Sequence, residues 1–295
     1  MMKRVSASEQ ERHLVSFQQI DHGFVKRDFV PALSRLQVRA RTERCAHRNW
    51  KCLSMPTNDR IRIAAVSDLH YTKGCRGTCQ EIFAQASHQA DVLLLCGDLT
   101  DDGLPEEAQV LADDLHSHAQ IPVIAVWGNH DFESARTAEV QEILEKVGVI
   151  FLDGAATEIK GVGFAGVCGF GGGFGQQMLN AWGEPLIKAF VQESADHALR
   201  LEKALKRLTG QKRVAVLHYS PIRETVEGEN LEIFPFLGSS RLEATIDQFK
   251  VSVVFHGHAH HGKMEGRTAG RVPVYNVSRP VLVKTTGKQF FVYEL

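Results

Sequence analysis

Side chains that can bind metal ions or transfer protons occur at five places in the chain, each directly after a short apolar run. They are Asp68 and His70 in SDLH, Asp98 and Asp101 in GDLTD, Asn129 and His130 in GNHD, His218 in LHYS, and His258 and His260 in GHAH. Residues i and i+2 of an extended backbone face the same side, so each Asp-x-His or His-x-His pair can hold one ion or two neighbouring ions. Carboxylate oxygen and imidazole nitrogen without thiolate suit Mn²⁺, Fe, Zn²⁺, Ni²⁺ or Co²⁺ better than a structural zinc or an all-oxygen calcium site.

The apolar runs before these residues predict the strands that position them. RIRIAAV, DVLLLC and IPVIAV alternate with helical spacing over residues 79–90, 104–120 and 133–148, which predicts βαβα layering with buried strands. Ligands in open α/β sheets bind beyond the carboxyl ends of the strands, so the motifs should converge although about thirty residues separate them. Two later strands end at His218 and before His258, and VPVYNVS and QFFVYEL alternate like antiparallel strands.

Charge divides the chain into two unequal parts. Residues 1–60 carry 12 basic and 6 acidic side chains, a charge of +6, whereas residues 61–295 carry 22 and 29, a charge of −7. We expect a basic, poorly ordered extension over residues 1–59, with Met55 as an alternative start, and one domain over residues 60–295. An acidic domain argues against nucleic acid as the main ligand, although a basic arm that contacts nucleic acid or an anionic surface is the alternative role for the extension.

Cysteine spacing and hydropathy bear on the compartment. The cysteines at 45, 52, 75, 79, 96 and 168 have neither the density of a disulfide framework nor a CxxC zinc pattern, which favours a reducing, cytoplasmic location. No apolar run approaches the roughly 18 to 20 residues that span a bilayer, so no membrane span is expected. The Cys75 and Cys79 pair is interpreted as loop thiols rather than as a metal or redox site.

Taken in order, the five motifs resemble those of the calcineurin-like metallophosphoesterase superfamily, and GDLTDDG resembles its bacterial cyclic-nucleotide phosphodiesterases. The resemblance covers residues 61–295. It implies an α/β fold in which a two-sheet β-sandwich is flanked by helices, giving four layers, with a dinuclear metal centre. It further implies one ion held by Asp68, His70, Asp98 and His260, and a second held by Asp98, Asn129, His218 and His258, so that Asp98 is the bridge.

The resemblance also implies a mechanism. It implies two divalent or mixed-valence transition metal ions. Two divalent ions carry a charge of +4, and two aspartates and a hydroxide together carry −3, so a charge of about +1 remains to face a phosphoryl group. A metal-bridging hydroxide attacks phosphorus. No protein nucleophile is then needed. His130 is the expected general acid for the leaving group, with Asp101 as the partner that orients its ring.

Substrate choice rests on weaker signals. No Arg or Lys adjoins the ligand motifs, and of the nearest basic residues only Arg223 is expected to reach inward, which favours a small phosphodiester over a doubly charged monoester. Tyr71 and Tyr219 directly follow motif residues and could stack on the substrate, with core packing as an equal alternative. A phosphomonoesterase, a protein phosphatase and a metal-binding scaffold without turnover remain alternatives. The physiological metal, natural substrate and oligomeric state are left open.

Two further patterns are set aside. Gly161, Gly163 and Gly166 spell GxGxxG, but the sequence continues with more glycine instead of opening a helix, so we do not interpret it as a nucleotide-binding loop. His256 and His261 flank GHAH, and we assign them to packing or solvent rather than to the metal centre.

Overall fold

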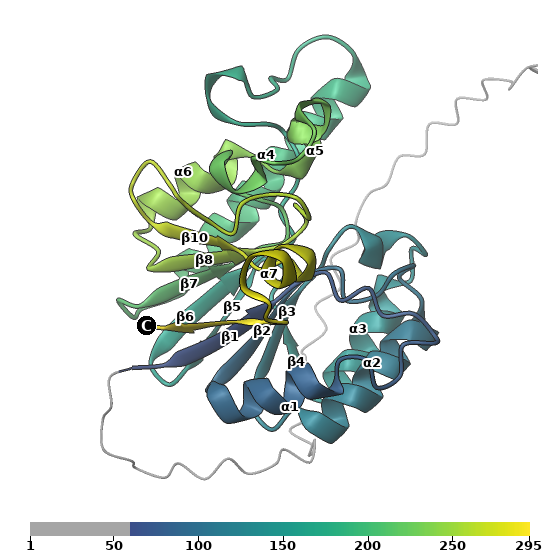
Figure 1. Cartoon of the computed structure of the whole chain (residues 1–295). Helices are drawn as coiled ribbons and strands as arrows, with labels where there is room; N and C mark the ends of the chain where they lie inside the picture. The colour runs from purple at the N-terminus through teal and green to yellow at the C-terminus, as the bar shows by residue number, and fades with distance from the viewer. Residues whose placement is uncertain (1–59) are drawn as a thin grey trace, which may run out of the picture. The chain divides into compact units, whose positions relative to one another are not determined.

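The computed structural model describes residues 60–295, and the predictions for residues 1–59 lie outside this range. Its described residues contain two β-sheets that pack face to face (Figure 1). The first sheet has the strand order β11 (Phe291–Glu294), β1 (Arg62–Val66), β2 (Val92–Cys96), β3 (Val123–Val126) and β4 (Val149–Phe151). The second has the order β5 (Ala155–Ile159), β6 (Val162–Gly166), β7 (Arg213–Val216), β8 (Val253–His256), β10 (Pro273–Asn276) and β9 (Glu265–Arg267).

Alternation along the strands builds the core between the sheets. In β1, Ile63 and Ala65 belong to the cluster shared with the second sheet, whereas Ala64 and Val66 belong to the cluster under the helices. Both faces of the strand are therefore buried, which explains its unbroken apolar sequence. Strands β1 to β4 run parallel, and β11 joins β1 antiparallel, so the C-terminal segment completes the first sheet.

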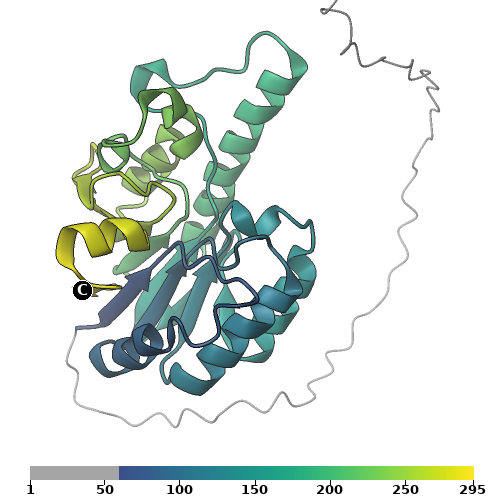
Figure 2. The same cartoon turned by 45° about the vertical axis from the view of Figure 1, so that its right-hand side comes forward.

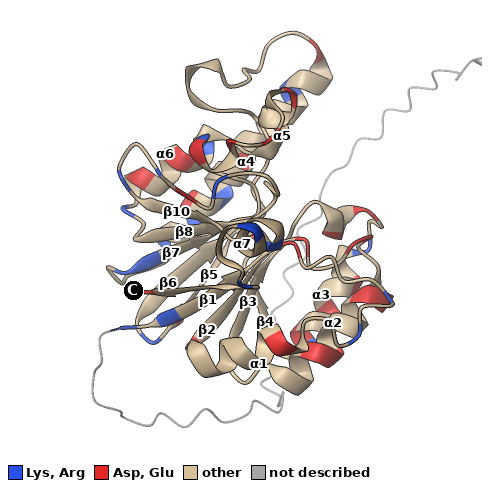
Figure 3. Cartoon of the chain, viewed as in Figure 1, with Lys and Arg blue, Asp and Glu red and all other residues tan. Residues whose placement is uncertain are grey.

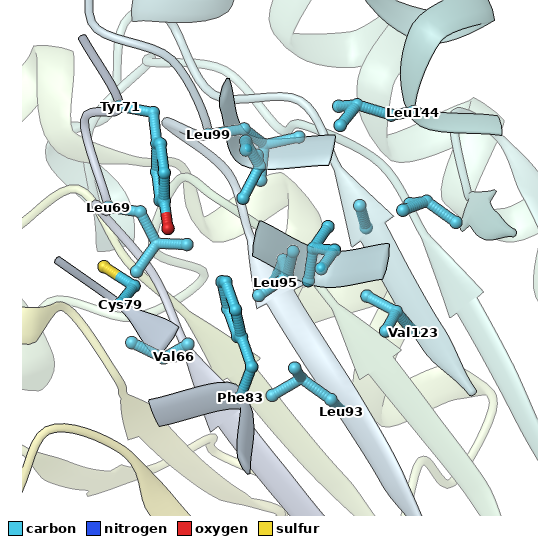
Figure 4. Close-up of a cluster of buried hydrophobic side chains, with 14 of the residues drawn as sticks. Val66, Leu69, Tyr71, Cys79, Phe83, Leu93, Leu95, Leu99, Val123 and Leu144 are labelled. Atoms are coloured by element: carbon cyan, nitrogen blue, oxygen red, sulfur yellow. The ribbon is translucent and has the colours of Figure 1, made fainter. Parts of the chain in front are cut away.

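Helices cover the outer face of the first sheet, as Figure 2 shows. They are α1 (Gln80–Gln89), α2 (Pro105–His118) and α3 (Thr137–Lys146), each within the range predicted from the sequence. Figure 4 shows the buried cluster beneath them, where Phe83 packs among side chains of the sheet such as Leu93 and Leu95. At the start of α2 the Glu107 carboxylate accepts hydrogen bonds from the amides of Asp102 and Leu104, which satisfies donors next to the GDLTD loop.

The second sheet is covered by α4 (Pro185–Lys206) and α6 (Ser240–Gln248). Leu201 and Leu205 of α4 pack on Ala215 and Val254 of the sheet. Shorter elements, α5 (Phe234–Leu237) and the 3₁₀ turns at His130–Phe132, Gly175–Gln177, Glu224–Val226 and Leu231–Ile233, connect the layers. The order helix, sheet, sheet, helix confirms the predicted four-layer α/β fold.

Two features of the C-terminal region differ from the sequence prediction. The helix α7 (Arg279–Thr286), with Pro280 in its first turn and Gly287 in the left-handed region after its end, was not predicted. Strand β10 pairs antiparallel with β9 and β11 pairs antiparallel with β1, as expected, but β10 also pairs parallel with β8, which was not expected. The GxGxxG glycines lie at the turn into and along β6, which agrees with their rejection as a nucleotide loop. Within residues 60–295, no helix has the length and apolar character needed to cross a membrane.

Candidate metal centre

The five motifs meet beyond the carboxyl ends of β1, β2, β3, β7 and β8. Hydrogen bonds join loops that are far apart in the sequence: the His130 amide donates to Asp98 Oδ1 at 2.9 Å, and the His258 amide donates to the Asp68 carboxylate at 3.2 Å. Nδ1 of His218 donates to the backbone oxygen of Cys96 at 2.9 Å. The convergence expected from the strand-end rule is therefore present in the structure.

Within residues 60–295, the acidic and histidine side chains form three groups whose potential ligand atoms lie within 4.8 Å of one another, and one of these, His70, Asp101 and His130, shares His70 with the first of the two groups considered next. Asp68, His70 and His260 form the first group, and Asp98, His218 and His258 form the second. Asp98 faces both groups: its Oδ2 lies 3.7 Å from Nε2 of His70, and its Oδ1 lies 3.4 Å from Nε2 of His218. This is the position that a bridging carboxylate requires.

Two glycines of the motifs make this close approach possible. A Cβ at Gly128 would lie 2.1 Å from both the amide nitrogen and Oδ1 of Asp98, and a Cβ at Gly257 would lie 1.9 Å from Ser67 Oγ and 2.5 Å from Asp68 Oδ2. No larger residue fits at either place without displacing a candidate ligand. The glycines of GNHD and GHAH thus serve packing around the carboxylates.

Backbone strain is concentrated at the candidate ligands. Asp68, His70, Asp98 and His258 have φ values of 61°, 46°, 47° and 69°, in the left-handed region that residues with a Cβ seldom adopt. Such conformations cost of order 1–3 kcal/mol each and persist where the surrounding structure enforces them, most often at functional sites. Four strained residues in one cluster indicate that the fold positions these side chains at the expense of favourable backbone conformations.

His70 has an unsatisfied nitrogen that faces the cluster. Its Nδ1 donates to Oδ1 of Asp101 at 3.1 Å, so Nε2 carries the lone pair. Within residues 60–295, this Nε2 is buried without a hydrogen-bond partner. A buried orphan nitrogen held in one tautomer by a carboxylate is the usual environment of a metal-binding histidine.

His218 meets only acceptor atoms on its inner side. Because its Nδ1 donates to a carbonyl, its Nε2 faces Asn129 Oδ1 at 3.0 Å and Asp98 Oδ1 at 3.4 Å. Burial alone would lower the pKa of His218, but the charge of Asp98 and its hydrogen bond raise it to about 9. Conversely, burial would raise the pKa of Asp98, whereas the charge of His218 holds it well below the usual range. A cation, either a proton or a metal ion, must bind among these atoms.

The other two histidines have contrasting environments. A hydrogen bond from Nε2 to Asp68 Oδ1, 3.0 Å long, raises the pKa of His260 above its usual value. His258 donates from Nε2 to the backbone oxygen of Phe236 at 3.2 Å, which leaves Nδ1 as its free lone pair, and burial lowers its pKa to about 4. Orphaned or acceptor-only atoms from both groups fit two divalent cations, although the assignment of each ligand stays a prediction.

Asp101 contacts the expected His130 through its main chain, whereas its carboxylate hydrogen-bonds His70. The Asp101 carboxylate lies 3.9 Å from Nδ1 of His130 and bonds His70 instead. Nδ1 of His130 donates to the backbone oxygen of Asp101 at 2.8 Å. His130 is thus held in one tautomer by a main-chain group, and its side chain is 40% exposed at the edge of the cluster.

Asp131 has a structural role that the sequence did not reveal. Its fully buried carboxylate accepts hydrogen bonds from the amides of Leu99, Thr100 and Gly128 and from the Thr100 hydroxyl, over distances of 2.6 to 3.2 Å. It therefore clamps the GDLTD loop to the GNHD loop. An aspartate directly after Asn-His was a visible signal, but its partners Leu99 and Thr100 are 32 and 31 residues away in sequence.

Of the three residues expected to contact substrate, only Tyr219 lies beside the cluster. Its half-buried ring packs on His258 with centroids 4.3 Å apart. Tyr71 is completely buried and donates a hydrogen bond from its hydroxyl to Asp114 at 2.9 Å, so it packs in the core, the alternative given for it, and does not contact substrate. Arg223 is exposed with its guanidinium 5.6 Å from the Phe234 ring centroid, and among residues 60–295 no contact draws it toward the metal groups.

Basic residues approach the site from α7 instead. A cavity beside Asp68 and His70 is also lined by Arg279 and Lys284 of this helix. Neither residue was predicted from the sequence, because α7 was not. Ser278 followed by Arg279-Pro280 was the available signal, since a serine before a first-turn proline favours a helix start.

The chain was compared with protein-family models, curated proteins and solved structures. A family model described as calcineurin-like phosphoesterase matches residues 61–262. No curated protein matches the sequence. Solved structures with the same fold include the phosphopantetheinyl hydrolase PptH of Mycobacterium tuberculosis, which is 16% identical, with 79% of this chain and 95% of that chain covered and a TM-score of 0.57.

Two other solved structures are similar over much of the chain. The protein described as GAP50, the anchor in the inner membrane complex of Plasmodium, is 12% identical, with 80% of this chain and 81% of that chain covered and a TM-score of 0.50. TT1561 of Thermus thermophilus is 20% identical, with 75% of this chain and 90% of that chain covered and a TM-score of 0.49. At these identities, similarity to solved structures shows only the fold.

Proposed function

The chain belongs to the calcineurin-like phosphoesterase family, and from this membership we propose that it is a metal-dependent phosphoric ester hydrolase whose substrate is a small phosphodiester. The observation that carries the proposal is the position of Asp98, whose two carboxylate oxygens face His70 and His218 on opposite sides. The metals we propose are Mn²⁺, Fe, Zn²⁺, Ni²⁺ or Co²⁺, because the donors are carboxylate, amide and imidazole.

Different residues of the chain would bind the metal ions and orient the ligands. When bound, two divalent ions polarise the phosphoryl oxygens and supply a hydroxide nucleophile at neutral pH. Asp68, His70, Asp98 and His260 would hold one ion, and Asp98, Asn129, His218 and His258 the other. Asp101 keeps His70 in the tautomer that leaves Nε2 as the donor atom.

His130 is the proposed general acid. The main-chain oxygen of Asp101 accepts a hydrogen bond from Nδ1 of His130. When the ring is protonated on both nitrogens, the proton on Nε2 is therefore the one that His130 can donate to the leaving group. Transfer of that proton to the leaving-group oxygen avoids release of an alkoxide and leaves a neutral imidazole. The ring lies beside His70, with centroids 4.5 Å apart, which places it next to the first metal group.

Two surfaces beside the site support a diester over a monoester. Tyr219, Phe170 and Phe190 form a chain of ring contacts that borders His258, with successive centroids 6.0 and 4.9 Å apart. The cavity beside α7 borders Asp68 and His70. A phosphodiester has two organic groups, and each of these surfaces offers an apolar contact for one of them.

Turnover distinguishes this proposal from a metal-binding scaffold. One fold neighbour is described as a hydrolase and another as an anchor, so the fold does not choose between the two roles. The test compares kcat/KM for p-nitrophenyl phosphate, bis(p-nitrophenyl) phosphate and a 3′,5′-cyclic nucleotide with Mn²⁺ present. We expect a diester to be the best substrate. A monoester that is at least about tenfold better than both diesters, a difference of about 1.4 kcal/mol, would move the assignment to a phosphomonoesterase or protein phosphatase.

We also propose a cytoplasmic location. Cys75, Cys79, Cys96 and Cys168, the cysteines within the described part of the chain, are free thiols. Free buried thiols are typical of proteins in reducing compartments.

A further inference from the structure

A shallow cavity of about 480 Å³, widely open to solvent, lies beside Asp68 and His70 of the first metal group. Asp68 and His70 line one part of it, and residues of α7 line the rest. Apart from Leu69, its other lining residues lie outside the five motifs. Its position next to the phosphoryl site suits a group attached to the phosphate.

The walls of the cavity combine apolar surface with one unpaired cation. Leu69, Pro280 and Val283 supply the apolar surface, and Val283 is 43% exposed although it is a large hydrophobic residue. Lys284 is exposed and makes no hydrogen bond or ion pair with any residue in the range 60–295. Basic positions on α7 are blue in Figure 3.

Arg279, the second basic residue of the cavity, is already engaged. Its Nε donates to Gln289 Oε1 at 2.7 Å, and its Nη1 lies 3.9 Å from Cys79 Sγ. It therefore holds the wall in place, whereas Lys284 has its ammonium group available. One ammonium ion suits a single anionic group, since lysine acts as a point charge and not as a two-pronged clamp.

The helix is fixed to the strand that carries the metal ligands. The Arg279 amide donates to the backbone oxygen of Ser67 at 3.1 Å, immediately before Asp68. Val281 and Leu282 are buried, and Leu282 packs in the core between the sheets. Lys284 is therefore presented from a rigid element, so that it can select among substrates without a costly ordering step.

We propose that this cavity binds the organic group of the substrate next to the scissile phosphate, and that Lys284 selects an organic group with an aliphatic stretch and an anionic end such as a carboxylate. The inference rests on the proposed phosphoesterase function and names the substrate class of that same site. The aliphatic stretch contacts Leu69, Pro280 and Val283, and the anionic end pairs with the ammonium group of Lys284.

The test uses two substrates that differ only at the far end of the organic group. In p-nitrophenyl pentyl phosphate and p-nitrophenyl 4-carboxybutyl phosphate, a carboxylate replaces the terminal methyl while the leaving group is unchanged. With Mn²⁺ present, we expect the wild type to prefer the carboxylate ester by about two- to fivefold in kcat/KM, the upper part of the range for an exposed charge pair. Lys284→Gln should bring the ratio close to one, and Lys284→Glu should invert it.

Lys288→Gln is the matched control, because Lys288 is an exposed lysine just past the same helix and lines a different cavity. It should keep the wild-type preference. Calorimetric binding of pentylphosphonate and 5-phosphonopentanoate gives a second readout without turnover, and the same pattern of ratios is expected. Turnover of both esters with no preference, or a preference that survives Lys284→Gln, would overturn the inference alone. No turnover of either ester or of bis(p-nitrophenyl) phosphate would overturn the proposed function as well.

Discussion

Asp98→Asn should remove both metal ions from the protein at once. The side chain keeps its shape, and its amide oxygen can still accept the hydrogen bond from the His130 amide, but the charge that faces both metal groups is lost. Breaking a buried charge pair costs about 3–5 kcal/mol, which corresponds to about 10²- to 10⁴-fold weaker binding of each ion. After dialysis against metal-free buffer, elemental analysis should find neither ion retained, and phosphoesterase activity should fall in parallel.

Two comparisons make this result specific. His260 belongs to the first metal group alone, so His260→Ala should reduce the metal content by about one ion and leave the second group filled. Asp102→Asn makes the same chemical change at an exposed aspartate four residues after Asp98 and should retain both ions. Asp98→Asn protein that melts normally and holds its full metal content, or that loses only one ion, would refute the bridging role of Asp98.

Four further outcomes follow from the contacts described above. His130→Ala should keep the metals but lose roughly 10²- to 10⁴-fold in rate on substrates with poor leaving groups, and less on nitrophenolate esters; an equal loss on both would show that His130 positions the phosphate instead. Asp131→Ala should lower the free energy of unfolding by on the order of 3–5 kcal/mol in denaturant titrations, because several buried donors lose their acceptor; an unchanged midpoint would remove its clamping role. The pKa of buried His256 is lowered to about 4, first by desolvation, so its contribution to stability is present above about pH 6.5 and is lost as the pH falls toward 4; melting curves of His256→Gln should depend less on pH in this window, and an identical dependence would contradict the assignment. A chain that begins at Met55 should fold and keep full activity; a large drop in melting temperature or turnover would show that the preceding residues contribute to the fold or the site.

The fold was predictable where one structural signal dominated. Apolar runs of strand length followed by polar loops gave β1, β2 and β3, because parallel strands buried on both faces have little choice of residue. The helix α7 was missed because Val281, Val283, Thr285 and Thr286 are β-branched and favour strands in isolation. Packing of Leu282 between the sheets and the hydrogen bond to Ser67 override that preference.

The candidate site was predictable to the extent that sequence neighbours share a direction. Asp68 and His70 both contribute to the cluster and the next residue, Tyr71, is buried in the core, but the left-handed φ values of Asp68 and His70 show that the segment is not the extended chain that the i, i+2 argument assumed. The partner of Asp101 was not predictable, because the choice between His70 and His130 depends on the angle at which two loops meet. The position of Lys284 beside Asp68 and His70 was not predictable for a different reason, since α7, the helix that carries it, was not predicted.

Metal content and turnover measured on one sample of the full-length protein test the dinuclear phosphoesterase most directly. We expect about two transition metal ions per chain and hydrolysis of bis(p-nitrophenyl) phosphate that disappears on chelation and returns when Mn²⁺ is added back. Two bound ions without turnover of this diester, of p-nitrophenyl phosphate or of a cyclic nucleotide would identify a metal-binding scaffold. Turnover that persists after complete removal of the metals would contradict the role of the Asp98-centred cluster in the reaction.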